Sequence, residues 1–260
     1  ARNHVNRIHR FRILVVGRAN SGKTTVLQRV CNTTDQPEIF DGEGRYVEYC
    51  IQLAIDCIQC GYHDIKNELV FKSNPHFVFH DSGGFESGSE KEFNQMRKFV
   101  MDCARTPKLE KYCIPCSETH RRVTAAERKF FEECDACHVP VIVLLIKADL
   151  LKLDAIEEIE DLGLVVDEVQ VAEVQKGILD EFLAEIEKYL NYCSFQPNGF
   201  LPLMRKCSIV ALMYMHEEGA DCTALLKCTT NALNEENLQM LLILTQQSNL
   251  ALCIEFAVMR

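Results

Sequence analysis

The chain has 260 residues, of which 47% are hydrophobic and 25% are charged, and this balance excludes a disordered chain in favour of a globular domain. Its formal net charge of −10 argues against a nucleic-acid-binding or anionic-membrane-binding surface, because long-range repulsion opposes both. No run approaches the about 18 apolar residues of a transmembrane segment and no signal-peptide pattern is present, so we expect a cytoplasmic protein. The chain begins at Ala1 rather than Met, which leaves open that it is a fragment of a longer protein.

Helices and strands are predicted to alternate along the chain. Short apolar runs bounded by turn residues predict strands at 11–16, 68–72, 76–80, 111–114, 139–146 and 208–214. Helical spacing of apolar residues predicts helices at 24–31, 89–105, 124–134, 154–192 (interrupted near Gly163), 221–233 and 235–259. The strand at 111–114 is expected to end at Pro115. The helix at 124–134 begins with a capping box, Thr124 followed by Glu127.

This alternation predicts an α/β fold. We expect a mostly parallel central sheet of about six strands, with crossover helices on both of its faces. The chain contains no internal repeat, low-complexity tract or linker that would divide it. We therefore expect residues 1–260 to form a single domain, with a C-terminal helical extension from about residue 217.

A glycine-rich segment, Gly17–Thr24, follows the first predicted strand. Its sequence GRANSGKT matches the pattern G-x-x-x-x-G-K-[ST] of P-loop nucleotide-binding proteins in full, between a strand and a helix. Its N–H groups are expected to converge on phosphate oxygens at the positive end of the helix, with Lys23 reaching the β- and γ-phosphates and the Thr24 hydroxyl ligating Mg²⁺. The residues predicted to bind nucleotide here are Gly17, Asn20, Ser21, Gly22, Lys23, Thr24 and Thr25.

A second motif, Asp81-Ser-Gly-Gly84, follows the strand predicted at 76–80 and fits the pattern D-x-x-G of GTPases. Its aspartate is expected to hold Mg²⁺ through a water molecule, so Thr24 and Asp81 form the predicted metal site. The Gly84 N–H is expected to contact the γ-phosphate. Loss of such a contact after hydrolysis is the usual origin of a molecular switch.

A third motif, Lys147-Ala-Asp149, follows the most apolar predicted strand, where GTPases carry [NT]-K-x-D. A carboxylate there accepts two N–H donors that guanine presents and adenine does not, and the lysine stem covers the base. Two readings stay open: Asp149 and Lys147 bind guanine, or Asp149 caps a helix beside a solvated lysine. Ile146 replaces the usual Asn or Thr, and the second guanine-side loop, expected near Met215–His216, lacks the usual Ser-Ala signature.

Together the three motifs resemble those of the TRAFAC-class GTPases, in the neighbourhood of septins and immune-associated GTPases. The chain is more similar still to a group of predicted G-domain proteins of mushroom-forming fungi. The segments that carry this resemblance extend over nearly the whole chain: FRILVVGRANSGKTTVLQRVCNTTDQPEIFDGEG, GYHDIKNELVFKSNP, FVFHDSGGFESG, YCIP, TAAERKFFEEC and TQQSNLALCIEFAV. The resemblance implies a guanine-nucleotide-binding G domain with GTP or GDP and Mg²⁺ as ligands, and no biological role comes with it.

The sequence marks hydrolysis less fully than binding. Phe85 follows the D-x-x-G glycine, where many GTPases carry the glutamine that orients water. No threonine lies between Thr34 and Asp81 to sense the γ-phosphate. Glu86 and His63 are candidate substitutes, although His63 also fits a surface loop residue. The predicted catalytic residues are Lys23, Thr24, His63, Gly84 and Glu86.

Three CxxC pairs occur among the 14 cysteines: Cys57/Cys60, Cys113/Cys116 and Cys134/Cys137, the last followed by His138. Two such pairs can form a zinc site, and CxxCH is also the haem-attachment pattern. However, the pairs lie in three different element contexts, and covalent haem attachment belongs to an oxidising compartment. We interpret most of the cysteines as reduced packing residues.

The leading hypothesis is a guanine-nucleotide-binding protein that hydrolyses GTP slowly with Mg²⁺ and acts as a molecular switch, with a homodimer or an effector protein as partner. A nucleotide-binding scaffold without hydrolysis stays open, motivated by Phe85, Ile146 and the missing threonine. A P-loop ATPase or kinase also stays open. Arg18, inside the glycine-rich segment, is either an arginine acting on the phosphates in cis or a solvated side chain.

Overall fold

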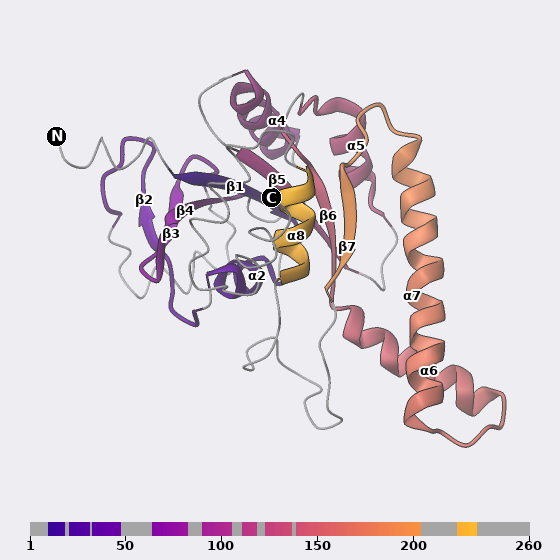
Figure 1. Cartoon of the computed structure of the whole chain (residues 1–260). Coiled ribbons are helices and arrows are strands. Elements are labelled where there is room, and N and C mark those ends of the chain that lie inside the picture. The colour runs from indigo at the N-terminus through magenta and orange to yellow at the C-terminus, as the bar shows by residue number, and fades with distance from the viewer. Residues whose placement is uncertain are drawn as a thin grey trace, which may run out of the picture.

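Within the part of the chain that the structure describes, a mixed sheet of seven strands organises the molecule (Figure 1). The computed structural model describes residues 10–18, 21–31, 33–47, 64–82, 90–105, 111–118, 123–136, 139–203 and 223–232. The strands are β1 (Phe11–Gly17), β2 (Glu38–Phe40), β3 (Glu68–Phe71), β4 (Asn74–Asp81), β5 (Lys111–Glu118), β6 (Ile142–Ile146) and β7 (Gly199–Pro202). Their order across the sheet is β2-β3-β4-β1-β5-β6-β7, which places β1 at the centre.

The five strands β4, β1, β5, β6 and β7 run parallel to one another. β1 pairs with β4 on one side and with β5 on the other, so that Val15 lies opposite both Asp81 and Ile114. β3 is antiparallel to β4 and to β2. Every residue of β6 is buried, as expected for a strand covered on both faces. The predicted α/β class is therefore confirmed.

The sheet differs from the prediction at three strands. It has seven strands rather than about six, because residues 38–40 of a polar segment pair with β3 at the edge. β5 continues past Pro115, which lies opposite Val16 of β1 and one residue before the register with β6 begins. The strand beside β6 is β7, a four-residue run containing Gly and Pro, whereas the strand predicted at 208–214 lies outside the described residues.

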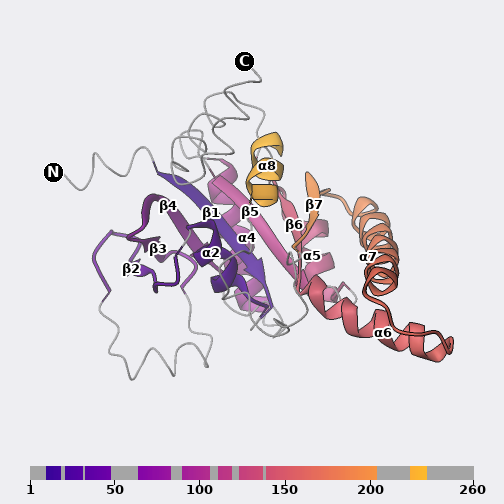
Figure 2. The same ribbon diagram turned by 60° about the horizontal axis from the view of Figure 1, so that its bottom comes forward.

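Helices cover both faces of the sheet (Figure 2). They are α2 (Lys23–Val30), α4 (Glu90–Ala104), α5 (Ala125–Glu133), α6 (Leu151–Asp161), α7 (Glu168–Asn191) and α8 (Thr223–Ala232), with a 3-10 turn, η1 (Ala148–Leu150). Alternate side chains of β1 face two cores. Ile13 and Val15 pack with α2 and with Leu225 of α8, whereas Leu14 and Val16 pack with α4, α5 and α7. The sheet is thus the middle of three layers.

The predicted helices agree with the structure where it describes them. The helices predicted at 24–31, 89–105, 124–134 and 221–233 correspond to α2, α4, α5 and α8, and the one at 235–259 lies outside the described residues. The acidic stretch forms α6 and α7, which pack on each other through Ala155, Ile159 and Val171. Gly163 ends α6 at the predicted interruption with φ 68°, a left-handed conformation typical of glycine after a helix. In the described part of the chain, no helix is long and apolar enough to cross a membrane.

A buried polar network joins β1, β3 and β4. Arg12 donates to Glu68 Oε1 at 2.9 Å and lies 3.1 Å from His80 Nε2. His80 Nδ1 lies 3.0 Å from the carbonyl oxygen of Ile65. Because that carbonyl only accepts, Nδ1 carries the proton and Nε2 accepts from Arg12. The ring of Phe99 on α4 packs 5.0 Å from the imidazole. Burial, together with the Arg12 charge, lowers the pKa of His80 to about 4.

We predict that His80 makes the protein less stable as the pH falls from about 6.5 to about 4. The folded pKa lies below the unfolded value of 6.5, so the unfolded chain binds the extra proton in this window. The free energy of unfolding should fall by up to about 3 kcal/mol from this group. Urea unfolding across this pH range should show a smaller fall for His80→Gln, which has no titrating ring.

The control for this prediction is His76, an exposed histidine on the same strand. His76→Gln removes an imidazole from the surface of β4 and leaves the contacts of Arg12, Glu68 and His80 in place, so it is the matched comparison for His80→Gln. If His80→Gln has the same pH dependence as the wild type, the assignment of a buried neutral imidazole is wrong.

Candidate functional site

The predicted site residues that the structure describes lie at one edge of the sheet. β1, β4 and β6 belong to its parallel part, so their carboxyl ends meet at the same edge. The glycine-rich loop (Gly17–Thr24) follows β1, Asp81 ends β4, and Lys147–Asp149 follow β6. The chain leaves β1 towards β4 on one side and later returns to β5 on the other. Open α/β sheets bind their ligands at such a point, outside the carboxyl ends of the strands.

The glycine-rich loop brings the N-terminus of α2 to this edge. Gly22 is the N-cap of α2 with φ 85° and ψ 15°, a left-handed conformation that favours glycine. Space is not the reason for the glycine, because an added Cβ would lie 4.0 Å from Cδ1 of Ile146. Gly22 has no side chain to cap the first N–H groups of α2. The helix dipole and these donors favour an anion at this position.

Lys23 connects the loop to the end of β4. Its Nζ donates to the carbonyl oxygens of Gly17 at 3.1 Å and Arg18 at 2.7 Å. The same Nζ lies 3.9 Å from Oδ1 of Asp81, and the lysine is only 8% exposed. The structure therefore brings together two residues that the sequence analysis placed in separate motifs. A cation and a carboxylate face each other at the mouth of the loop.

The hydroxyl side chains of the loop have different environments. Ser21 is completely buried, and its Oγ has no hydrogen-bond partner within the part of the chain that the structure describes. A buried hydroxyl without a partner costs free energy, and an oxygen-rich ligand in the loop would satisfy it. Thr24 is exposed and Thr25 is half-exposed in the first turn of α2. The Ser21 hydroxyl, one residue before the N-cap of α2, is the group of this loop that such a ligand would satisfy.

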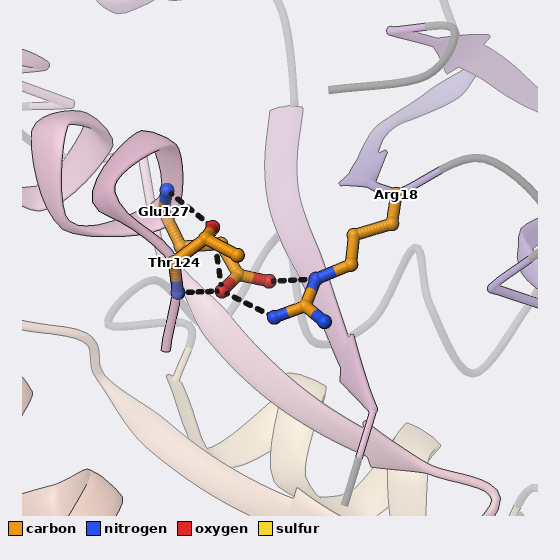
Figure 3. Close-up of polar contacts among 3 residues, drawn as sticks. All are labelled: Arg18, Thr124 and Glu127. Carbon is orange, nitrogen blue, oxygen red and sulfur yellow. Dashed lines mark hydrogen bonds and ion pairs between the residues drawn. The ribbon is translucent and has the colours of Figure 1, made fainter. Parts of the chain in front are cut away.

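Arg18 is not solvated, contrary to one of the two interpretations of the sequence. The arginine is 3% exposed and its guanidinium extends to Glu127 at the start of α5 (Figure 3). Nε lies 3.2 Å from Oε1 and Nη2 lies 3.0 Å from Oε2, which forms two parallel charge-assisted bonds. A buried guanidinium requires such a partner, because desolvation of an unpaired charge is costly.

Glu127 has two roles, and the sequence indicates only its role in capping α5. The predicted capping box is present: the Glu127 N–H donates to Thr124 Oγ1 and the Thr124 N–H donates to Glu127 Oε2. The same carboxylate also binds Arg18. The sequence signal for Glu127 was therefore local, and its contact with the glycine-rich loop could not be inferred from it.

The loop after β6 forms a tight turn held by backbone bonds. Lys147 has φ 61°, and the Leu150 N–H donates to its carbonyl oxygen at 3.0 Å. Ala148 is completely buried, and Gln175 of α7 donates from Nε2 to the Ala148 carbonyl oxygen at 3.2 Å. Gln175 was not predicted as part of the site, because nothing in its spacing connects it to the loop. Its contact holds the loop against α7.

Asp149 caps neither of the helices that begin at this loop. The N-caps of η1 and α6 are Lys147 and Leu150, and neither cap involves a side-chain hydrogen bond. The helix-capping interpretation of Asp149 is therefore wrong. Ile146, in place of the usual polar residue, is buried in the core beneath Gly22. An apolar core residue therefore occupies the position where an amide or hydroxyl was expected.

Several predicted residues lie outside the described part of the chain: Asn20, His63, Gly84, Phe85 and Glu86. The second guanine-side loop, predicted near Met215–His216, also lies outside the described residues. Beside the end of β6, the Leu203 N–H after β7 donates to the Leu145 carbonyl oxygen at 2.8 Å.

Four described cysteines pack in the two cores that cover the sheet. Cys31 and Cys228 pack with the core around α2, and Cys134 and Cys193 pack with the core around α5. Burial raises the pKa of Cys134 to about 12, so this thiol stays protonated. Its partners in the third CxxC pattern, Cys137 and His138, lie outside the described residues, as do Cys57 and Cys60. Within the described ranges, no group of three or more His, Cys, Asp or Glu side chains is placed to hold a metal ion.

The sequence matches no protein-family model and no curated protein. Among solved structures, a probable GTP-binding protein EngB is 15% identical, with a TM-score of 0.42 over 86% of this chain and 99% of that chain. An Era variant of Aquifex aeolicus bound to GDP·AlF4− is 14% identical, with a TM-score of 0.42 over 86% of this chain and 57% of that chain. At this level of similarity, the function has to be argued from the site itself.

Proposed function

We propose that this chain is a guanine-nucleotide-binding protein that holds a nucleoside triphosphate and Mg²⁺ at the carboxyl ends of β1, β4 and β6. The observation that carries the proposal is the position of Lys23 Nζ, between two loop carbonyl oxygens and Asp81. It lies at the N-terminus of an α-helix capped by a left-handed glycine. The Lys23 ammonium, the dipole of α2 and the Ser21 hydroxyl are together the groups that recognise a phosphate chain.

Thr24 and Asp81 are the residues that would hold Mg²⁺. Both offer hard oxygen atoms, and Mg²⁺ fills its remaining positions with water and phosphate oxygens, so a site with few protein ligands suits it. The bound ion would supply charge neutralisation on the phosphates. Asp81 already faces the glycine-rich loop, as its 3.9 Å distance from Lys23 Nζ indicates.

Asp149 is proposed to select guanine over adenine. Guanine presents two adjacent N–H donors on one edge, which match the acceptor-only carboxylate, and adenine does not. The absence of a capping role for Asp149 in η1 and α6 supports this assignment. The stem of Lys147 would cover the base, from a turn fixed by its left-handed backbone and by Gln175.

Hydrolysis of GTP is proposed to be slow. The arginine of the glycine-rich loop, Arg18, is committed to Glu127 and does not supply positive charge to the phosphates. An arginine at the transferred phosphate is worth roughly 10³- to 10⁵-fold in rate. In a GTP/GDP switch with such slow hydrolysis, faster turnover depends on a homodimer or an effector protein. A scaffold without hydrolysis is the alternative.

We predict that Lys23→Ala weakens binding of GTP with Mg²⁺ by about 100-fold, because charge-assisted bonds to the phosphates are lost. Isothermal titration calorimetry on the purified protein measures the affinity. Lys72→Ala is the matched control, since Lys72 is exposed in a surface ion pair with Glu38. Tight binding retained by Lys23→Ala would refute the phosphate site.

For the base, Asp149→Ala should lower the affinity for GTP to that for ATP and leave ATP binding unchanged. The reason is that only the guanine donors lose a partner. The exposed Asp154 on α6 serves as the control, and Asp154→Ala should preserve the preference. Equal affinities of the wild type for ATP and GTP would instead favour an ATPase or a kinase.

In single-turnover reactions with GTP and Mg²⁺, we expect phosphate release that is slow but measurable over hours. The Lys23→Ala variant provides the background rate. If the wild type binds GTP and releases no phosphate above that background, the scaffold is the correct description and the GTPase is not.

A further inference from the structure

We propose that the buried ion pair between Arg18 and Glu127 fixes the position of the Arg18 carbonyl oxygen, which makes Glu127 a positioning residue for Lys23. The inference rests on the proposed function and extends it to a residue on α5, a helix outside the three motifs. It predicts that nucleotide affinity depends on a contact that does not touch the nucleotide.

The side chain of Arg18 is held in one orientation. Its guanidinium makes two parallel bonds to the Glu127 carboxylate, at 3.2 Å and 3.0 Å, and both side chains are almost fully buried. A planar guanidinium bound to both oxygens of a planar carboxylate has little freedom to rotate. The contact therefore fixes the orientation of the Arg18 side chain as well as its distance from Glu127.

The backbone of Arg18 is part of the site itself. Its carbonyl oxygen accepts from Lys23 Nζ at 2.7 Å, the shortest bond that Lys23 makes in the described chain, and from the Ser21 N–H at 3.3 Å. A rotation of the Arg18 backbone would move the acceptor of Lys23. One residue thus links the carboxylate of Glu127 to the ammonium of Lys23.

The side chain of Glu127 is itself held by hydrogen bonds. Its Oε2 accepts from the Thr124 N–H at 2.7 Å and from the Thr124 hydroxyl at 3.0 Å (Figure 3). The helix that carries it is anchored in the core by Phe130 and Phe131. The capping box therefore holds the Glu127 carboxylate in place, and Arg18 connects the glycine-rich loop to this carboxylate.

An ion pair that only stabilises the fold and one that also positions the loop respond differently to mutation. Removing one partner leaves a buried charge unpaired, which destabilises the fold in any case. Removing both charges together commonly costs little stability. Arg18→Met with Glu127→Gln removes both charges, and glutamine still fits the capping box. A purely structural pair would leave this double variant with both normal stability and normal affinity.

The experiment measures the melting temperature and the affinity for GTP and ATP, each with Mg²⁺, for the wild type and the double variant. We expect a melting temperature within a few degrees of the wild type and a loss of GTP affinity of about tenfold or more. The ratio of GTP to ATP affinity should not change, because Asp149 is untouched. The matched control is Arg128→Met with Glu132→Gln, an exposed Arg–Glu pair on the same helix, and it should bind GTP normally.

A second variant keeps the test valid if the double variant does not fold. Arg18→Lys retains the charge and loses the two-bond geometry, so it should fold and bind GTP more weakly than the wild type. Wild-type affinity in the folded double variant, or in Arg18→Lys, would overturn this inference and leave the proposed function standing. Failure of the wild type to bind GTP or ATP would overturn the proposed function and the inference together.

Discussion

The parallel alignment of β4, β1, β5 and β6 is the constraint on which the rest of the structure depends. Parallel neighbours need crossover connections, so each of these strands delivers its following loop to the same edge of the sheet. β1 is central, and its alternating side chains fill the cores on both faces. The glycine-rich loop consequently follows the central strand of the sheet. The segments after β1, β4 and β6, which are distant in the sequence, lie at this one edge.

Two cations of the glycine-rich loop are used in different ways because their surroundings differ. Lys23 is bonded to carbonyl oxygens and lies at a longer distance from Asp81, so its charge is not fully neutralised inside the protein. Arg18 is matched by a carboxylate in two short bonds. The first arrangement is the one that we propose for an anionic ligand, and in the second the charge of Arg18 is paired with Glu127. Residue type alone does not distinguish these roles.

Much of the fold could be predicted, since local patterns specify local structure. The buried run of β6, the capping box of α5 and the interruption at Gly163 each depend on neighbouring residues, and each lies where the pattern indicated. β2 and β7 were missed because they are short edge strands without a hydrophobic period, formed only by pairing with β3 and β6. Pro115 predicted the end of a strand, but β5 continues through it and pairs with β6 from Cys116 onwards.

The sequence by itself determined the chemistry available to this protein: the glycine-rich loop with Lys23, the carboxylate of Asp81 and the carboxylate of Asp149. Consecutive residues specify these groups, so a pattern is enough to find them. Only the tertiary structure decided how they are arranged and supported. Arg18 meets Glu127 across 109 residues of chain, and Gln175 holds Ala148 from another helix. Which buried charge finds which partner depends on how α5 and α7 pack on the sheet, and that long-range packing leaves no periodic trace in the sequence.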